Sequence, residues 1–293
     1  MGLFAAEIVQ EAIERIRKFA KIAKAMELPV SVGFSGGKDS QVVYDLCLKS
    51  GIEFTAYFNH ALESPVTLRF IKEKYPAVIW RRDVKEGMIQ HIREYRKGLF
   101  PTVQIAYCCE AYKHNPNYVD KCAILGIRRA ESAARAERTV FTTKNKTILK
   151  KNKTLVSEYF KDECQSVGSA NIITLYPIVD WSEEDVWDYI LTNKIPINPE
   201  YEYCNRVGCM VCPKANFTSN YVMLKKYPKL IDAFIKAHSQ EGCDWIITSE
   251  NKDYSNDKTR YICRWLNHSF MPFTEKQEKL YKKLLTVLND GKH

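Results

Sequence analysis

The sequence predicts an α/β protein in which a doubly wound parallel sheet carries helices on both faces and is followed by a helical C-terminal extension. Short β-prone runs alternate with helical patterns at a spacing typical of strand–helix–strand units. The first of these runs leads through a glycine-containing turn directly into a helical pattern. Of the 293 residues, 45% are apolar, which is enough for a buried core and excludes a disordered or fibrous chain.

The individual elements follow from local patterns. A first helix is expected over residues 4–25, where one stripe carries Ile8, Ala12, Ile16, Phe19 and Ala23. The β-prone runs lie at residues 29–34, 53–58, 77–80, 122–127 and 171–177. The helical patterns lie at residues 41–49, 65–74, 86–97, 221–238 and 275–288. A further helix is expected after Ser182, whose hydroxyl would cap it while Asp185 reaches back.

The turn after the first expected strand is the most informative local feature. Its six residues are Ser35, Gly36, Gly37, Lys38, Asp39 and Ser40. The glycines allow close approach to an anion, the amides at a helix start point toward it, and the serines and the lysine add donors and charge. The aspartate can hold a Mg²⁺ ion that bridges phosphates.

This turn lacks the P-loop spacing and instead resembles the PP-loop of the ATP pyrophosphatases. These adenine-nucleotide α-hydrolases break ATP between the α and β phosphates. The resemblance implies that the six residues bind ATP and Mg²⁺. The alternative is a glycine-rich turn without a ligand.

Four of the ten cysteines form two close pairs, Cys108-Cys109 and the Cys-x-x-Cys of Cys209 and Cys212. Four thiolates can bind one zinc ion or hold an iron–sulfur cluster. Adjacent thiolates suit a cluster, because separate irons can each take one sulfur. The spacing therefore favours a cluster but leaves zinc open. The other cysteines are expected to pack as small apolar residues, with Cys204 near enough to serve as a spare ligand or sulfur carrier.

The residues around these cysteines resemble the phosphoadenosine phosphosulfate (PAPS) reductase-like family of the PP-loop superfamily. Residues 108–113 (CCEAYK) resemble its double-cysteine segment, and residues 207–213 (VGCMVCP) resemble its second cysteine pair. The resemblance implies a [4Fe–4S] cluster at the four cysteines.

Two further segments extend the resemblance over residues 28–215. The stretch that contains Arg128, Arg129 and Arg135 resembles the family's nucleotide- and sulfate-binding segment, which implies that these arginines bind anionic groups. Residues 177–196 resemble its hallmark stretch before the second cysteine pair. We expect an N-terminal helix at 1–27, a PP-loop nucleotide-binding domain with the cysteine cluster at 28–215, and a helical extension at 216–293.

Two features depart from the reductases. Lys38 and Asp39 complete a turn that is usually degraded in them, as if a whole ATP were bound. The catalytic C-terminal cysteine motif is also missing, since Glu241-Gly242-Cys243 does not match it. An intact PP-loop with a cysteine-bound cluster is instead found in DNA phosphorothioation ATPases and cluster-dependent tRNA thiolases.

The leading hypothesis is therefore an ATP-dependent iron–sulfur sulfurtransferase that thiolates or phosphorothioates nucleic acid, with Lys38, Asp39 and Arg128 acting in catalysis and a cysteine desulfurase supplying sulfur. One alternative is an adenylyl-sulfate or phosphoadenylyl-sulfate reductase with a thioredoxin-like donor, in which Cys243 would be needed. Another is a nucleotide-sensing or redox module without turnover.

The chain carries a net charge of +9, and its basic residues are concentrated between Arg128 and Lys153. This segment contains nine basic residues and two acidic ones. A hairpin with a basic tip at residues 144–146 is expected there. It could grip a polyanion backbone, or its lysines could merely keep a sheet edge soluble.

The sequence also predicts a cytoplasmic location. No apolar run approaches the roughly 18 residues that a membrane span needs. The first 25 residues are too charged for a signal peptide. The cysteines are therefore expected to be reduced.

Overall fold

The structure is a computed structural model, and it describes residues 3–82, 85–96, 98–114, 121–143, 158–160, 164–166 and 172–238, with single positions at 265, 275, 278, 279, 282, 283 and 286. The chain divides into two compact units. Unit 1 comprises residues 1–59, 65–81 and 117–201, and unit 2 comprises residues 60–64, 82–116 and 202–293. The domain boundaries expected from the sequence stay a prediction.

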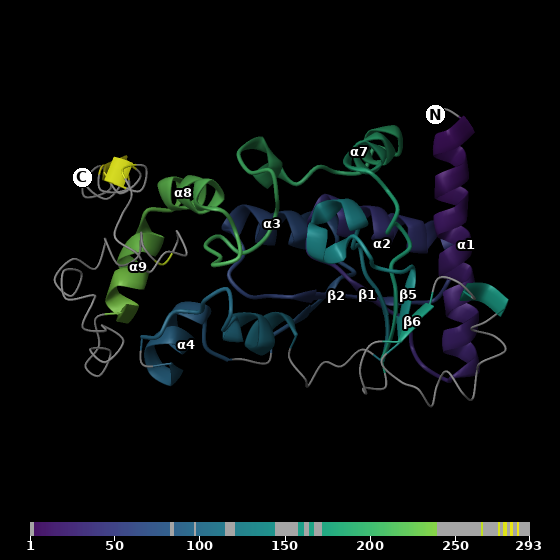
Figure 1. The fold of residues 1–293 in the computed structure, drawn as a ribbon, viewed down its shortest axis with the longest axis horizontal. Coiled ribbons are helices and arrows are strands. Elements are labelled where there is room, and N and C mark those ends of the chain that lie inside the picture. The colour runs from purple at the N-terminus through teal and green to yellow at the C-terminus, as the bar shows by residue number, and fades with distance from the viewer. Residues whose placement is uncertain are drawn as a thin grey trace. The chain divides into compact units, whose positions relative to one another are not determined.

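The described strands of unit 1 form a seven-stranded sheet in the order β3-β2-β1-β4-β7-β5-β6. Figure 1 labels β1, β2, β5 and β6 of this sheet. The strands are β1 (Ser31–Gly33), β2 (Thr55–Asn59), β3 (Ile79–Arg81), β4 (Cys122–Ile124), β5 (Phe141–Thr143), β6 (Cys164–Ser166) and β7 (Ile173–Leu175). The run β3-β2-β1-β4-β7 is parallel throughout. This confirms the α/β class and the parallel core of the sheet.

One edge of the sheet differs from a fully parallel arrangement. β5 pairs antiparallel with β7 and parallel with β6. Short turns rather than a crossover helix precede β5, and an antiparallel pair needs no crossover. The expected hairpin continues past Thr143 into residues that lie outside the described part of the chain.

The helices described in unit 1 are α1 (Leu3–Ala25), α2 (Lys38–Ser50), α3 (Pro65–Lys74) and α7 (Glu183–Thr192). Those described in unit 2 are α4 (Met88–Tyr95), the π-helical turn η1 (Cys109–Lys113), α8 (Phe217–Lys226) and α9 (Lys229–His238). Short 3-10 turns are η3 (Arg129–Glu131), η4 (Ala133–Arg135) and η5 (Pro199–Glu202). Among the described helices, none is long and apolar enough to cross a bilayer.

The packing of unit 1 confirms the predicted stripe of α1. Ala12, Ile16, Phe19 and Ala23 are buried, and the Phe19 ring meets the Phe141 ring of β5 edge-on at 6.0 Å. α7 begins with the predicted capping box. The Ser182 hydroxyl accepts from the Asp185 amide at 3.0 Å, and the Asp185 carboxylate accepts from the Ser182 amide at 2.8 Å.

Unit 2 has its own apolar core. The Phe100 ring contacts those of Phe234 and Trp265, with ring centroids 5.5 and 4.9 Å away. The single helix expected over residues 221–238 is two helices, α8 and α9, separated at Pro228, which has no backbone N–H to continue a helix. Within the expected last helix, each of the described positions between 275 and 286 is helical.

Candidate functional site

The turn at residues 35–40 lies at the switch point of the sheet in unit 1. β1 has β2 on one side and β4 on the other, so the chain first builds the sheet outward through β2 and β3 and then returns to the opposite side of β1. Loops that follow the carboxyl ends of two such strands diverge and leave a crevice. The turn follows β1, residues 125–128 follow β4, and α2 begins at Lys38. The strand–turn–helix context expected of a PP-loop is present.

Hydrogen bonds within the turn fix its shape. The Ser40 hydroxyl donates to the Gly37 carbonyl at 2.8 Å and accepts from the Ser35 amide at 3.1 Å. The Ser35 and Ser40 hydroxyls are also 3.1 Å apart. Because the single hydroxyl proton of Ser40 goes to Gly37, Ser35 is the donor in this second hydrogen bond. The serines that the sequence marks as phosphate donors therefore first hold the loop together.

Gly36 is required by both its conformation and its surroundings. Its φ of +74° lies in the left-handed region, and a Cβ there would come within 2.9 Å of the Ile71 Cδ1 atom of α3. The Gly36 carbonyl accepts a hydrogen bond from the buried Asn198 side chain at 2.9 Å. The turn is thus clamped between α3 and the segment before η5.

A second glycine brings the β4 loop onto the turn. A Cβ at Gly126 would lie 2.7 Å from the Asp39 carbonyl oxygen, so only glycine permits this approach. Arg128 follows two residues later and is almost fully buried, with 2% of its surface exposed. Its side chain therefore enters the site beside the start of α2.

Four charged side chains form a closed network at this point. The Arg128 guanidinium donates to the Asp39 carboxylate at 2.5 Å and to the Glu183 carboxylate at 2.9 Å. The Lys38 ammonium lies 3.4 Å from an Asp39 oxygen and 3.3 Å from the other Glu183 oxygen. Two cations thus face two carboxylates.

The network shifts the pKa values of Arg128 and Glu183. Burial lowers the pKa of Arg128, but the adjacent Asp39 and Glu183 carboxylates more than offset this and raise it. Burial raises the pKa of Glu183, but hydrogen bonds and charge from Arg128 and Lys38 hold it below 4.5. The attraction between opposite charges therefore outweighs burial and keeps Arg128 and Glu183 charged at neutral pH.

Two aromatic side chains that the sequence analysis did not mark as site residues border the network. The Tyr201 hydroxyl accepts from the backbone N–H of Lys38 at 2.9 Å, and burial raises its pKa. The Trp187 ring meets the Tyr201 ring edge-on at 5.2 Å, and its indole N–H donates to Glu183 at 3.3 Å. Glu183 was also missed. Its position after the hallmark Trp181-Ser182 pair, at the carboxyl edge of a parallel sheet, was the available signal.

The other two arginines proposed for the nucleotide do not contact this network. Arg129 pairs with Asp180 and donates to the Arg138 carbonyl at 2.7 Å. Arg135, in η4, pairs with Glu131 at the end of η3. The structure therefore brings Arg128 to the turn and gives Arg129 and Arg135 carboxylate partners of their own. Their role at a nucleotide stays a prediction.

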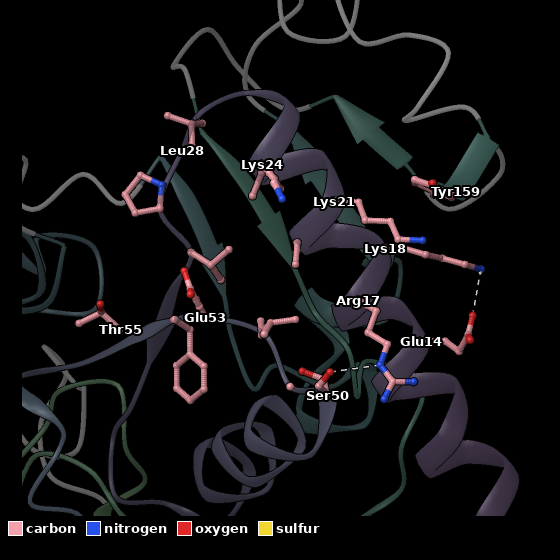
Figure 2. A pocket seen from close by; sticks show the side chains of 17 residues that line it. Glu14, Arg17, Lys18, Lys21, Lys24, Leu28, Ser50, Glu53, Thr55 and Tyr159 are labelled. Atoms are coloured by element: carbon pink, nitrogen blue, oxygen red, sulfur yellow. Dashed lines mark hydrogen bonds and ion pairs between the residues drawn. The ribbon is translucent and has the colours of Figure 1, made fainter.

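A hollow of about 890 Å³ lies at the amino ends of β1 and β2 of the same sheet. Figure 2 shows Arg17, Lys18, Lys21 and Lys24 along α1 at its border, with Tyr159 facing the helix. Residues 29–30 and 54–55, where β1 and β2 begin, also line it. Because nucleotides bind at the carboxyl ends of parallel strands, this hollow is not the predicted nucleotide site.

In unit 2 the second predicted cysteine pair contributes to the raised pKa of Cys108 in the first pair. Cys108 precedes η1, and Cys109 is its first residue. The Cys108 thiol donates to Cys109, which together with burial and the nearby Cys209 and Cys212 raises its pKa. That hydrogen bond, aided by the charges of two lysines, lowers the pKa of Cys109 to about 6 against the effect of burial.

Backbone contacts anchor the second pair. Cys209 forms a β-bridge with Glu63, and the Met210 amide donates to the Leu62 carbonyl at 2.8 Å. The buried Asn220 side chain of α8 accepts from the Cys212 amide at 3.0 Å and donates to the Cys212 carbonyl at 2.9 Å. These anchors are contributed by Glu63 and Asn220, which no sequence motif marked.

An ion pair between a half-buried lysine and a buried glutamate lies near Cys209. The Lys113 ammonium is 2.9 Å from the Glu63 carboxylate, whose side chain is only 1% exposed. Burial lowers the pKa of Lys113, but Cys209 and Glu63 raise it above its ordinary value. Burial raises the pKa of Cys209 to about 11, although Lys113 opposes this.

The donor set of the four cysteines suits either a cluster or zinc. Among the residues that the structure describes, however, no three His, Cys, Asp or Glu side chains have the arrangement of a preformed metal site. Cys209 and Cys212 are close enough to raise the pKa of Cys108, but the four thiols are not arranged as ligands. The cluster at these cysteines stays a prediction.

Comparison with known proteins adds the family. A family model described as "Phosphoadenosine phosphosulfate reductase domain" matches residues 29–215. The uncharacterized protein MJ0066 of Methanocaldococcus jannaschii is 31% identical over 215 residues, which cover 69% of this chain and 40% of that protein. Sulfate adenylyltransferase subunit 2 of Mesorhizobium japonicum is 26% identical over 197 residues, which cover 64% of this chain and 65% of that protein.

The chain thus spans 40% and 65% of the length of these two relatives. Among solved structures, a phosphoadenylyl-sulfate reductase from Candida auris, in complex with phosphate, matches with 14% identity and a TM-score of 0.44. That match covers 71% of this chain and 96% of the other. A similarity this distant carries no argument about the site.

Proposed function

Because this chain belongs to the phosphoadenosine phosphosulfate reductase domain family, we propose that it is an ATP-dependent sulfurtransferase that forms AMP and pyrophosphate and acts on nucleic acid. The observation that carries the proposal is the complete turn at residues 35–40, where Lys38 and Asp39 meet Arg128 at the carboxyl edge of the sheet. A leaving pyrophosphate needs positive charge and helix-terminal amides of this kind. The name sulfate adenylyltransferase, carried by one relative, denotes adenylyl transfer, the class of the first step proposed here.

In the first step an acceptor oxygen attacks the α-phosphorus of ATP, and the bond to the bridging oxygen breaks to release pyrophosphate. Lys38 and the amides at the start of α2 bind the departing phosphates. Asp39 would hold a Mg²⁺ ion, which would supply positive charge to the phosphates, and Arg128 would offset the developing charge. In the second step a hydrosulfide ion, released when a thiol reductant supplies two electrons to the desulfurase persulfide, forms a bond to the acceptor as the bond to the adenylated oxygen breaks and AMP leaves.

The four cysteines Cys108, Cys109, Cys209 and Cys212 would hold the [4Fe–4S] cluster. When bound, such a cluster can carry sulfur or electrons. The chain itself supplies the four thiols and the Lys113 ammonium, whose positive charge favours the thiolate forms of Cys109 and Cys209.

Nucleic acid as the acceptor is supported by charge. Nine basic residues lie between Arg128 and Lys153, and the four arginines among them have partners within unit 1. The five lysines at positions 144–153 lie outside the described residues. They are the candidates for phosphate-backbone contacts.

The experiment that tests the proposal follows the products from ATP labelled at the α-phosphate, with tRNA, duplex DNA or sulfate as acceptor and a cysteine desulfurase with cysteine and dithiothreitol as sulfur source and reductant. We expect labelled AMP, pyrophosphate, and sulfur in one nucleic acid. Lys38→Met should lower the rate at least 100-fold. Lys49→Met, at the other end of α2, is the matched control and should leave the rate within twofold. Release of ADP, or adenylyl-sulfate as the only product, would contradict the proposal.

The cluster is tested separately by the iron and zinc content of anaerobically purified protein. We expect four irons per chain and their loss in Cys109→Ser. Cys47→Ala, which changes a buried cysteine of α2, should retain the iron. One zinc and no iron would refute the cluster.

A second candidate is favoured by the family match itself. It is an adenylyl-sulfate or phosphoadenylyl-sulfate reductase with a thioredoxin-like donor. Sulfite release from either nucleotide, abolished by Cys243→Ser, would support it over the sulfurtransferase. Cys243 lies outside the described residues.

A further inference from the structure

The Glu183 carboxylate contacts both cations of the proposed nucleotide site, as a bound anion would. Its two carboxylate oxygens lie 2.9 Å from the Arg128 guanidinium and 3.3 Å from the Lys38 ammonium. These cations are 2% and 7% exposed, so few other groups can reach them. A bound phosphate would need the same two cations.

Glu183 also differs from the other three charged groups in its freedom to move. The Glu183 side chain is 55% exposed, compared with 16% for Asp39. It stands at the first position of α7, and the helix is capped without it by Ser182 and Asp185. The carboxylate can therefore leave the network by side-chain rotation while α7 stays in place.

The neighbouring aromatic residues extend this closed arrangement. The Trp187 indole N–H donates to the second Glu183 oxygen, and the Trp187 ring packs on Tyr201. The Tyr201 hydroxyl in turn accepts from the backbone N–H of Lys38, which is one of the amides at the start of α2. One connected set of side chains thus covers both the ammonium and the amide of Lys38.

We propose that Glu183 is an affinity-setting latch, whose carboxylate holds Lys38 and Arg128 in the absence of ligand and is displaced by the phosphates of the nucleotide. The inference rests on the proposed nucleotide site. The lowered pKa of Glu183 agrees with it, because it keeps the competing charge present at neutral pH. The latch costs nucleotide affinity and keeps the buried cations paired when the site is empty.

The test compares Glu183→Gln with Glu184→Gln in the full-length protein. Glu184 is the next residue on α7 and is also exposed, so the two variants make the same charge change on the same helical turn. The probes are inorganic pyrophosphate and the α,β-methylene analogue of ATP, each with Mg²⁺, measured by titration calorimetry. We expect Glu183→Gln to bind both about tenfold more tightly than the wild type, since two partly exposed ion pairs no longer compete. Glu184→Gln should stay within twofold of the wild type.

The outcomes separate the latch from the proposed function. Equal or weaker binding by Glu183→Gln, with binding by the wild type intact, overturns the latch alone. Absence of binding by both proteins overturns the nucleotide site and the latch together. Glu183→Asp, which keeps a carboxylate, should bind more weakly than Glu183→Gln. If it binds equally tightly, competition by charge is refuted.

A second readout follows the displacement itself. When the Glu183 carboxylate leaves, the hydrogen bond from the Trp187 indole is lost. Pyrophosphate should therefore change the tryptophan fluorescence of the wild type, and Trp187→Phe should remove that change. A change of equal size in Trp187→Phe, or none in the wild type at saturation, would overturn the proposed movement.

Discussion

The turn at residues 35–40 in unit 1 and the two cysteine pairs in unit 2 both gather reactive groups, but they differ in how charge is balanced. At the turn, Lys38 and Arg128 already face two carboxylates at 2.5–3.4 Å. At the cysteines, Cys108 donates to Cys109 and Lys113 pairs with Glu63. An anion must therefore compete with side chains at the first site, whereas a metal must displace thiol protons at the second.

The strongest way to break this comparison is to remove the cation at the centre of the first site. Arg128→Met should lower the free energy of unfolding by about 3 kcal/mol, because it removes the most buried charge of the network and leaves Lys38 alone against two carboxylates. Chemical denaturation measures this. Arg129→Met removes a partly exposed arginine of the same segment and should cost less than about 1 kcal/mol. Equal losses in the two variants would show that burial of Arg128 is unimportant.

The backbone of the turn offers the next largest effect. Gly36→Ala should cost about 2–3 kcal/mol, because it adds left-handed strain and a contact with Ile71. Gly51, the C-cap of α2, has a similar φ of +71° but no atom within 4 Å of a new Cβ. Gly51→Ala therefore isolates the strain and should cost about 1 kcal/mol. If Gly36→Ala costs no more than Gly51→Ala, the close packing on α3 is not decisive.

The anchor of the second cysteine pair should give a smaller loss. Asn220→Ala removes both hydrogen bonds to the Cys212 backbone and should lower the free energy of unfolding by about 1–2 kcal/mol. It should also reduce the metal bound per chain. Asn216→Ala removes only the N-cap of α8, with a cost of about 1 kcal/mol, and should leave metal binding unchanged. Unchanged metal content in Asn220→Ala would show that this anchor does not position Cys212.

The smallest expected effect is the pH dependence contributed by Glu183. Folding lowers the pKa of the Glu183 carboxyl. Its contribution to stability is therefore fully present at pH values above its ordinary pKa of 4.5 and is lost as the pH falls through the lowered pKa. The difference in unfolding free energy between the wild type and Glu183→Gln should thus shrink below pH 4.5. Because the side chain is 55% exposed, the change should be under about 1 kcal/mol.

Much of the fold could be predicted because its causes are local. The stripe of α1, the cap of α7 and the strand–turn–helix at residues 35–40 each depend on neighbours within a few residues. The break between α8 and α9 at Pro228 was missed although its cause is also local. The orientation of β5 was not predictable, because strand direction depends on how the intervening chain travels.

The sequence by itself determined which groups the molecule carries: the glycine turn with Lys38 and Asp39, the arginine segment and the two cysteine pairs. Only the tertiary structure decided which of them meet. It brought Arg128 to Asp39, 89 positions earlier in the chain, and placed Glu183 against both cations. Local patterns specify backbone conformation, whereas such long-range pairs are set by strand order and by the pairing that buried charges require.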